Sequence, residues 1–466
     1  MIDNGLIAFS LRVLGMTFWR NLNIGTKITV VMLPCILVII AVISFVSIKT
    51  SRTAIEAEAF NKLVAIRELK AMQIERYFAQ IRKQMETFSE NKMIVWAMKD
   101  FSKGFDTLEN ALILKEFRVT ESEENLTKYY REKFLPKLAS NLNRNVFIEN
   151  YFPKTDAAIA LQDLYISSNK NEVGSKHLLN DPKDGSSYSA AHANYHPIIR
   201  NYLDKFGYYD IFLIDAKTGN IVYSVYKEAD FATSLVDGPY AKTNFAKVFQ
   251  FAKSAKRKSF VKLVDFEPYH PSYNAAASFI ASPIFEKDML IGVAVFQMPI
   301  DIINSVMTSN QDWQANGMGA SGETYMVGSD YTLRSESRFL IENPEQYLKL
   351  MSELSMDEKL VAEIKNAESA IGRQRIRTEA TERGLSGDSG VSIIKDYRDI
   401  SVLSAFKPPK IADVEWAIMS EIDESEAFAP LNKLQETMLF IALISMAIAA
   451  SVIIIFSRVY ISSPIN

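Results

Sequence analysis

Two long stretches without a charged residue constrain the fold more than any other feature of this 466-residue chain. The first is ITVVMLPCILVIIAVISFVSI, residues 28–48, and the second is TMLFIALISMAIAASVIIIFS, residues 437–457. A helix of that length, at about 1.5 Å per residue, spans about 31 Å, which is the thickness of the hydrocarbon core of a bilayer. The sequence therefore predicts two transmembrane helices. Buried core helices are the alternative for both runs.

The first run could instead be a cleaved signal peptide, but it is longer than the usual apolar region of ~7–15 residues and no clear A-x-A site follows it. We therefore expect a retained anchor. Basic residues precede the first span and follow the second, whereas the outer flank of the second span is acidic. The positive-inside rule then places 1–27 and 458–466 in the cytoplasm and about 49–436 outside it.

Composition and motifs exclude several classes of function. The chain has 52 basic and 55 acidic residues, so no overall positive field favours a nucleic acid. The single cysteine, Cys35, excludes an intramolecular disulfide and a cysteine-rich metal cluster. GMGASGETYMVG and GLSGDSG lack the Lys-Ser/Thr of a phosphate-binding loop, and DAKTGN lacks the ligand pattern of a calcium loop. We expect loops leading into strands for the first two and a hairpin turn for the third.

No catalytic arrangement, metal site or cofactor is predicted for this chain. A Ser-His-Asp or Cys-His arrangement is not evident in the sequence, so we expect no enzyme here, although an output domain beyond this chain could be one. His192 and His196 are spaced to share one helix face, where a metal pair would be an alternative, but no acidic partner stands beside them in the expected pattern.

Residues 49–101 are predicted to continue out of the membrane as one long helix. The segment from Ser51 to Phe101 has no proline or glycine. Its apolar residues recur at alternating steps of about three and four, a stripe that Lys70 interrupts: Leu63, Ile66, Ile74, Phe78, Ile81, Met85 and Phe88. Such a helix is expected to be a scaffold for the outer domain and, in a sharper interpretation, a rod that joins it to the first span.

The remaining outer segment changes to strand patterns in two similar rounds. Residues 208–231 indicate a hairpin, followed by candidate strands 260–266, 277–285 and 290–298 and a helix over 300–310. Residues 324–340 indicate strand, turn and strand, 344–369 a helical connector, and 390–397, 400–408 and 414–423 further strands before a helix near Glu424. The repetition predicts an α+β fold of two modules with antiparallel sheets on one long helix. A single continuous sandwich is the alternative.

The segment LVDFEPYHPSYNAAASFIASPI, residues 263–284, is the candidate ligand site. Prolines that fix a loop bearing aromatic and small polar groups at the rim of a sheet suit a pocket for a small polar ligand. A crossover whose tyrosines cover the core fits the same residues equally well. The candidate ligand-binding residues, taken from this loop, the hairpin and a late strand, are Tyr208, Asp210, Tyr223, Tyr226, Asp265, Tyr269, Ser272, Ser278 and Gln297.

Several stretches resemble the double Cache sensory domains of bacterial transmembrane receptors over about 50–425. They are RELKAMQIERYF, FSENKMIVWAM, GSSYSAAHANYHPIIRNYLDKFGYYDIFLIDAKTGNIVYSVYKEADFATSL, FQMPIDIIN, SGETYMVGSDYTLRSESRF and EIDESEAFAPL. The resemblance implies two PAS-like modules: a membrane-distal one, 102–318, that holds the ligand, and a membrane-proximal one, 319–425, that passes the change to the second span. The terminal RVYISSPIN, 458–466, resembles the start of a HAMP linker.

The same resemblance implies a multi-pass receptor of the cell inner membrane with its sensory domain in the periplasm. It further implies a small-molecule ligand, a homodimer and cytoplasmic signalling partners, with chemotaxis as the expected output. The sensor of an adenylate/guanylate cyclase or histidine kinase is an alternative, and a membrane-anchored binding protein without an output domain is another. One subgroup binds amino acids or amines through an Arg-x-Trp-Tyr run and a late Asp. This sequence lacks that run around 258–270, and Gln297 stands near the place of the Asp.

Overall fold

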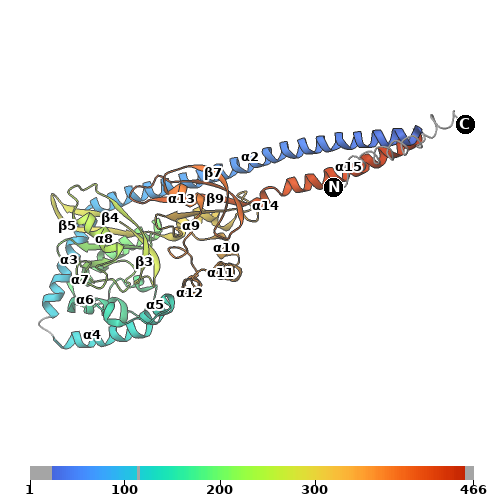
Figure 1. Ribbon diagram of the computed structural model, residues 1–466. Helices are drawn as coiled ribbons and strands as arrows, with labels where there is room; N and C mark the ends of the chain where they lie inside the picture. Colours follow the sequence, from blue (N-terminus) through green and yellow to red (C-terminus); the bar gives the residue numbers. More distant parts are fainter. Residues whose placement is uncertain (1–23, 113–115, 457–466) are drawn as a thin grey trace, which may run out of the picture. The chain divides into compact units, whose positions relative to one another are not determined.

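The computed structural model describes residues 24–112 and 116–456, and its contacts divide the chain into two compact units (Figure 1). One unit comprises the described parts of 1–62 and 424–466, and the other comprises 63–423. Most of the expected cytoplasmic N-terminus and the HAMP-like segment lie outside the described residues. The two units are described separately below.

The first unit contains two helices that are long and apolar enough to cross a membrane. They are α2 (Ile24–Glu90), whose first part belongs to this unit, and α15 (Ala429–Phe456). The most apolar window of α2 has no buried residue and that of α15 has 6% buried, so their apolar side chains face outward as they would toward lipid. The short α14 (Glu424–Ala427) precedes α15, and Arg52 lies over the ring of Phe428 at 5.2 Å. The two uncharged runs thus lie in helices that are apolar enough to cross a membrane, as predicted.

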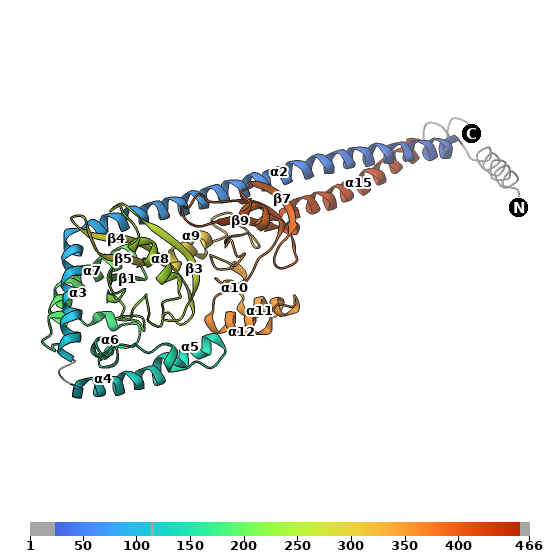
Figure 2. The same ribbon diagram turned by 60° about the vertical axis from the view of Figure 1, so that its left-hand side comes forward.

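In the second unit, α2 continues from Leu63 and buries the predicted apolar stripe. Ile74, Phe78, Ile81 and Met85 are each at most 3% exposed. Lys70, which interrupts the stripe, is itself only 7% exposed. The prediction of one helix through residue 101 is wrong, however, because α2 ends at Glu90 and α3 (Lys92–Leu112) begins after Asn91. The side chain of Asn91 accepts the N–H of Met93 at 2.8 Å and so caps the new helix, and the chain turns sharply there (Figures 1 and 2).

A five-stranded antiparallel sheet follows, with the order β2-β1-β5-β4-β3. Its strands are β1 (Asp210–Asp215), β2 (Ile221–Ser224), β3 (Lys262–Tyr269), β4 (Ala275–Glu286) and β5 (Met289–Gln297). The predicted hairpin, its Lys-Thr-Gly-Asn turn and the three later strands are confirmed. In the turn, Asp215 accepts the N–H groups of Lys217 and Thr218 at 2.9 and 2.8 Å, and Gly219 takes a φ of +78°.

Helices cover both faces of this sheet. Those before it are α4 (Glu116–Tyr129), the π-helical turn η1 (Tyr130–Phe134), α5 (Leu135–Leu142), α6 (Asp156–Gln162) and α7 (Ser187–Phe206); α8 (Asn244–Lys253) lies between β2 and β3. One face packs with α2, α3 and α7 in a core that includes Phe101, Tyr188 and Leu213. The other face packs with α8, η1 and α5 in a core that includes Phe212, Phe245 and Phe279. We call these the α2 face and the α8 face.

A four-stranded antiparallel sheet with the order β6-β9-β8-β7 repeats the arrangement. Its strands are β6 (Glu323–Gly328), β7 (Gly390–Lys395), β8 (Ser401–Lys407) and β9 (Trp416–Asp423). The helices around it are α9 (Ile300–Thr308), α10 (Arg338–Glu342), α11 (Pro344–Glu353), α12 (Glu358–Ala367) and α13 (Glu379–Leu385). Because the order 6-9-8-7 matches 1-5-4-3 of the first sheet, the predicted α+β class and the two-sheet duplication are confirmed.

The second strand predicted within 324–340 is not formed. Residues 331–335 make only isolated bridges, Val327 with Leu333 and Thr332 with Arg375. Tyr331 takes a left-handed φ of +66°, and the side chain of Arg334 reaches back to Asp265 of the first sheet. The segment that corresponds to β2 is therefore used to join the two sheets and not to extend the second one.

A close helix contact on the α2 face gives a stability prediction. A Cβ at Gly104 of α3 would stand 2.8 Å from the Cα of Tyr188 in α7. Gly to Ala inside a helix normally stabilises by roughly 1 kcal/mol, but overpacking a backbone contact costs about 1–3 kcal/mol. We expect Gly104→Ala to lower the melting temperature of the full chain, measured by tryptophan fluorescence. The exposed neighbour Lys103→Ala is the control, and a raised melting temperature for Gly104→Ala would contradict the α3–α7 contact.

Candidate functional site

The faces of the first sheet separate the nine sequence-predicted site residues into groups. Asp210 and Gln297 are paired in register on β1 and β5 and share the α8 face with Phe212 and Val295. Tyr269 belongs to the same α8-face core. Tyr269, Asp210 and Gln297 are at most 3% exposed, so this face carries buried polar groups in an otherwise apolar core.

Three predicted residues lie on the α2 face instead. The hydroxyl of Tyr208 donates to Gln84 Oε1 of α2 at 2.5 Å, and that of Tyr223 lies 2.7 Å from His196 Nδ1 of α7. Ser278 stands two residues from Ile280 on β4 and donates to the carbonyl of Val264 at 2.7 Å. These residues are part of the packing between the sheet and its helices, on the face opposite to Asp210, Gln297 and Tyr269.

We define the polar cluster as Asp210, Lys227, Glu228, Asp230, Tyr269, Ser272 and Gln297, which hydrogen bonds and charges connect. Asp210 Oδ1 accepts the N–H of Val225 at 2.8 Å and of Tyr226 at 3.2 Å, which anchors the loop after β2. That loop carries Lys227, Glu228 and Asp230 within four positions. Lys227 takes a φ of +59°, so the chain reverses there and the two acidic side chains follow at once. Tyr226, the remaining hairpin candidate, thus lies beside the cluster.

The loop between β3 and β4 supplies the partners of these carboxylates. The Tyr269 hydroxyl donates to Asp230 Oδ2 at 2.5 Å. Ser272 Oγ donates to Glu228 Oε2 at 2.9 Å, and Gln297 Nε2 donates to that Ser272 Oγ at 3.2 Å. The predicted loop thus meets the predicted late strand here. The sequence prediction did not include Glu228 and Asp230, although the run Lys-Glu-Ala-Asp at 227–230 directly after a buried strand is a signal that could have found them.

Burial disfavours the charged forms of the ionisable side chains in the polar cluster. Loss of solvent, together with neighbouring carboxylates for the first two, raises the pKa of Asp210 to about 7, of Glu228 to about 8 and of Asp230 to about 6. Burial also lowers the pKa of Lys227 to about 7, despite the nearby Asp210. The Lys227 ammonium lies 4.4 Å from the ring centre of Tyr223 and donates to the carbonyl of Ser224. Burial thus makes ionisation of these carboxyl groups less favourable than it is in water.

Several polar atoms on the α8 face have no hydrogen-bond partner within the described residues. They are Asp230 Oδ1, Tyr240 Oη, Asn244 Oδ1 and Gln297 Oε1. All four side chains are at most 3% exposed. The ring of Tyr240 lies 6.2 Å from that of Tyr269, so the first two atoms belong to neighbouring side chains. Buried polar groups are normally paired, and three of these four atoms are acceptors. The arrangement suits a small molecule that brings hydrogen-bond donors.

Asp265, the remaining predicted residue, joins the two sheets. A bulge in β3 between Val264 and Glu267 turns its carboxylate toward the second sheet. Arg334 donates to it through Nε at 2.8 Å and Nη2 at 2.9 Å, and Trp416 Nε1 of β9 donates at 3.0 Å. Arg334 and Trp416 are each 2% exposed. Asp265 thus lies four residues before Tyr269 on the same strand and contacts the first residue of β9.

The histidine pair predicted to share a helix face lies on α7. The rings of His192 and His196 stack with centres 4.2 Å apart and are fully buried. His196 already contacts the Tyr223 hydroxyl and the carbonyl of His177, both at 2.7 Å. Burial lowers the pKa of both imidazoles, and the described part of the chain contains no cluster of three metal-binding side chains. This geometry is that of a neutral packed pair.

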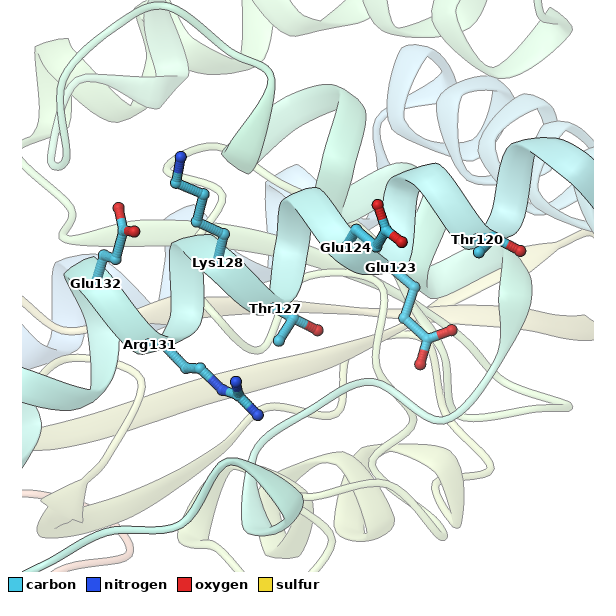
Figure 3. A pocket seen from close by; sticks show the side chains of 7 residues that line it. All are labelled: Thr120, Glu123, Glu124, Thr127, Lys128, Arg131 and Glu132. Atoms are coloured by element: carbon cyan, nitrogen blue, oxygen red, sulfur yellow. The ribbon is translucent and has the colours of Figure 1, made fainter.

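A groove of about 480 Å³ lies over α4 and η1, away from the polar cluster. Every residue that lines it comes from one stretch of helix, 120–132. Figure 3 shows that Lys128 and Glu132 point to one side whereas Arg131 and Glu123 point to the other. These exposed side chains do not converge on a common point, so the groove is not the candidate site.

Comparisons with known proteins concern only the fold. No protein-family model matches the chain, and no curated protein matches it. Similar solved structures include the ligand-binding domain of the amino acid chemoreceptor PctB of Pseudomonas aeruginosa in complex with L-Arg, at 13% identity, covering 66% of this chain and 98% of that chain with a TM-score of 0.32. That of the chemoreceptor CtaA of Pseudomonas fluorescens in complex with L-isoleucine has 14% identity, 70% and 95% coverage and a TM-score of 0.29. The sensor domain of the histidine kinase DctB of V. cholerae has 13% identity, 64% and 99% coverage and a TM-score of 0.32.

Proposed function

We propose that this chain is the sensory part of a two-span membrane receptor whose polar cluster binds a small molecule carrying a cationic hydrogen-bond donor. The observation that carries the proposal is the set of buried, unpartnered acceptors beside three carboxyl groups on the α8 face. A primary ammonium group has three donors and a positive charge, so it suits buried acceptors such as Asp230 Oδ1 and Gln297 Oε1. The two apolar helices and the resemblance to double Cache receptors support the placement in a membrane.

The polar cluster and the Asp265 junction share strand β3, which gives a route for a signal. A ligand that draws Tyr269 and Ser272 toward itself moves the end of β3, and Asp265 lies four residues earlier. From Asp265 the bonds lead to Arg334 and to Trp416 at the start of β9. β9 ends at Asp423, and α14 and the apolar α15 follow directly in the chain. A ligand needs to favour one of two arrangements by only a few kcal/mol to switch an output.

A ligand screen on the full chain in lipid nanodiscs tests this proposal. Amines, amino acids, organic acids and purines are compared by thermal shift, and the hits are titrated calorimetrically. We expect the compounds that raise the melting temperature to carry a cationic donor. Tyr269→Phe removes the hydroxyl that holds Asp230 and should weaken binding of every hit, whereas Tyr331→Phe, in the turn after β6, should not. Hits confined to anions, or hits indifferent to Tyr269→Phe, would contradict the assignment.

Chemotaxis is the proposed output, and a cyclase or histidine kinase output differs only in the cytoplasmic sequence that would follow such a sensor. A membrane-anchored binding protein needs no contact that couples its two sheets. The buried ion pair between Asp265 and Arg334, which links them, therefore favours a signalling receptor. We expect no catalysis in the described part of the chain.

Ligand affinity is expected to rise with pH between about 6 and 8. A cationic ligand favours ionised carboxylates, and Asp230, Asp210 and Glu228 lose their protons at about 6, 7 and 8 when no ligand is bound. Lys227 loses its positive charge in the same range, at about 7, which acts in the same direction. We expect roughly tenfold tighter binding of a cationic hit at pH 8 than at pH 6, since one pKa unit corresponds to a factor of ten. Calorimetry in buffers of different ionisation enthalpy should show proton release; proton uptake would contradict the charge assignment.

A further inference from the structure

Two glutamates lie directly opposite each other in the second sheet. Glu323 of β6 is paired in register with Glu421 of β9, and both side chains are 3% exposed. Opposed residues of an antiparallel pair have Cβ atoms about 4.5–5.5 Å apart and share one face of the sheet. Tyr325 and Met419, two positions along each strand, belong to the buried core on that face. The two carboxyl groups are therefore buried as neighbours.

The position of this pair corresponds to that of Asp210 and Gln297 in the first sheet. The neighbours β6 and β9 correspond to β1 and β5 in the duplicated strand order. Asp210 is the first residue of β1 and faces Gln297, just as Glu323 is the first residue of β6 and faces Glu421. The first sheet thus has an acid opposite an amide, whereas the second sheet has two acids opposite each other.

Every carboxyl oxygen of the pair accepts a hydrogen bond from an uncharged donor. Glu323 Oε1 accepts a backbone N–H of α10 at 2.7 Å, and its Oε2 accepts the Tyr397 hydroxyl at 2.6 Å. Glu421 Oε1 accepts the Ser404 hydroxyl at 2.7 Å, and its Oε2 accepts that of Tyr325 at 3.1 Å. Because no oxygen of the pair lacks a donor, the species that the pair is built to gain or lose is a proton.

The charged side chains around the pair are bound to other groups. Arg398 donates to Asp396 at 2.6 Å and to Asp423 at 2.5 Å. The guanidinium of Arg338 in α10 donates to Glu342 and to two backbone carbonyls. The charged side chains of α11, α12 and α13 all lie at least partly at the surface. The other buried or half-buried titratable groups of this face are Tyr325, Tyr347, Tyr397 and Glu336. Within the described residues, no cation forms an ion pair with Glu323 or Glu421.

The surroundings of the pair favour its protonated form. Burial, with the charge of Asp396 acting in the same direction, raises the pKa of Glu323 to about 7 and that of Glu421 to about 8. Two carboxyl groups that interact this closely lose their protons as one unit in two steps, because the first negative charge opposes the second. As the pH rises, the pair gives up a proton to water and a buried negative charge appears between β6 and β9.

We infer that the Glu323–Glu421 pair is a proton-responsive switch, through which the second sheet responds to pH without a ligand. Like charges directly opposite each other destabilise an antiparallel pair of strands, so ionisation loosens the contact between β6 and β9. Glu421 stands two residues before the end of β9, and α14 and α15 follow directly in the chain. The inference does not depend on the proposed function, since the pair shares no residue with the polar cluster.

Thermal unfolding of the full chain in nanodiscs, without ligand, tests the sign of this switch. The unfolded chain releases both protons near the ordinary pKa of 4.5, whereas the fold holds them to about 7 and 8, so the pair lowers stability as the pH rises through this range. Glu323→Gln/Glu421→Gln keeps the pair neutral at every pH. Its melting temperature should approach that of wild type at about pH 5 and exceed it by a margin that grows to about pH 9. Glu345→Gln, at an exposed position of α11, should follow wild type throughout.

Infrared spectroscopy reports the protons of the pair directly, because a carboxylic acid and a carboxylate absorb at different frequencies. Wild type should lose acid absorption between about pH 6 and about pH 9, and Glu323→Gln and Glu421→Gln should each lack part of that change. Ser404→Ala keeps both glutamates, so it serves even if the amide variants do not fold. It removes a donor to Glu421 Oε1 and should move the loss of acid absorption to higher pH by about 0.5–1 unit.

Hydrogen–deuterium exchange in 416–423, corrected for its intrinsic pH dependence, reports the response of β9. Exchange should rise from about pH 6 to about pH 9 in wild type and stay constant in Glu421→Gln. The inference is overturned if the margin in melting temperature does not grow with pH, if the acid absorption is independent of both glutamates and of Ser404, or if 416–423 respond to pH equally in wild type and Glu421→Gln. None of these outcomes bears on ligand binding at the polar cluster, because no ligand is added and all variants lie outside it.

Discussion

Replacing Arg334 by alanine is expected to lower the free energy of unfolding by about 3–5 kcal/mol, the usual cost of removing one partner of a buried ion pair. Arg334 is 2% exposed and binds both oxygens of Asp265, at 2.8 and 2.9 Å. Without it, the Asp265 carboxylate keeps only the indole of Trp416 and its local backbone bond as partners among the described residues. Thermal unfolding of the full chain in nanodiscs, followed by tryptophan fluorescence, measures the loss.

Two further variants show whether the effect comes from this ion pair. Arg377 pairs with Glu382 at 2.7 Å, but both side chains are largely exposed, so Arg377→Ala should change stability little. Asp265→Asn combined with Arg334→Met removes both buried charges and should be much less destabilising than Arg334→Ala alone, because the only carboxylate left without Arg334 is that of Asp330, which is 55% exposed to water. Equal losses for Arg334→Ala and Arg377→Ala would show that the junction contributes nothing special to the fold.

Asp230→Asn is expected to weaken binding of a cationic ligand by about 10- to 150-fold while leaving the fold at least as stable. The loss in affinity corresponds to a charge-assisted hydrogen bond of about 1.5–3 kcal/mol. The fold should tolerate the change because burial raises the pKa of Asp230 to about 6. Without ligand, the buried carboxylate is therefore less stable than it would be in water, and a neutral amide avoids that cost. The asparagine keeps an oxygen in reach of the Tyr269 hydroxyl, which now donates to Asp230 Oδ2. Calorimetry gives the affinity and thermal unfolding gives the stability of the same sample.

A matched control for this prediction is Asp237→Asn, an exposed position in the same connection between β2 and α8. It removes the same charge and should leave the affinity unchanged. If both variants weaken binding equally, the ligand responds to the net charge of the region and not to a bond with Asp230. If Asp230→Asn binds as wild type does, the polar cluster does not contact the cation.

Periodicity was sufficient to predict the strands of both sheets, whereas α4, α5, α6, α7 and α8 were not predicted. The strands predicted at 277–285 and 290–298 agree with β4 and β5, whose central residues are buried, and the helix predicted near 300–310 agrees with α9. The break between α2 and α3 was missed because Asn91 stops a helix through its side-chain cap, within a stretch that has no proline or glycine. The strand predicted near 331–335 does not form, because Arg334 makes a long-range contact with Asp265 that a local sequence pattern does not reveal.

The candidate site was predicted in part for a similar reason. Proline, tyrosine and serine in one segment pointed to the β3–β4 loop, where Tyr269 and Ser272 meet Asp230 and Glu228, and ligand binding there stays a prediction. Which face of the sheet a residue occupies depends on register and on bulges, so Tyr223 and Ser278 could not be separated from Asp210 and Gln297 by sequence. Asp265 was predicted as a ligand-binding residue because it lies in the same segment as Tyr269 and Ser272. In the structure it lies at the bulge in β3 and pairs with Arg334.

Hydrogen–deuterium exchange of the full chain in nanodiscs, with and without a cationic hit from the screen, tests the central claim most directly. The claim is that a small ligand binds at the polar cluster and that the change reaches β9 through Asp265. We predict slower exchange in 225–231 and 269–275 on ligand binding, together with a change in 416–423 that Asp265→Asn abolishes. Protection confined to other segments, or a response of 416–423 that survives Asp265→Asn, would contradict it.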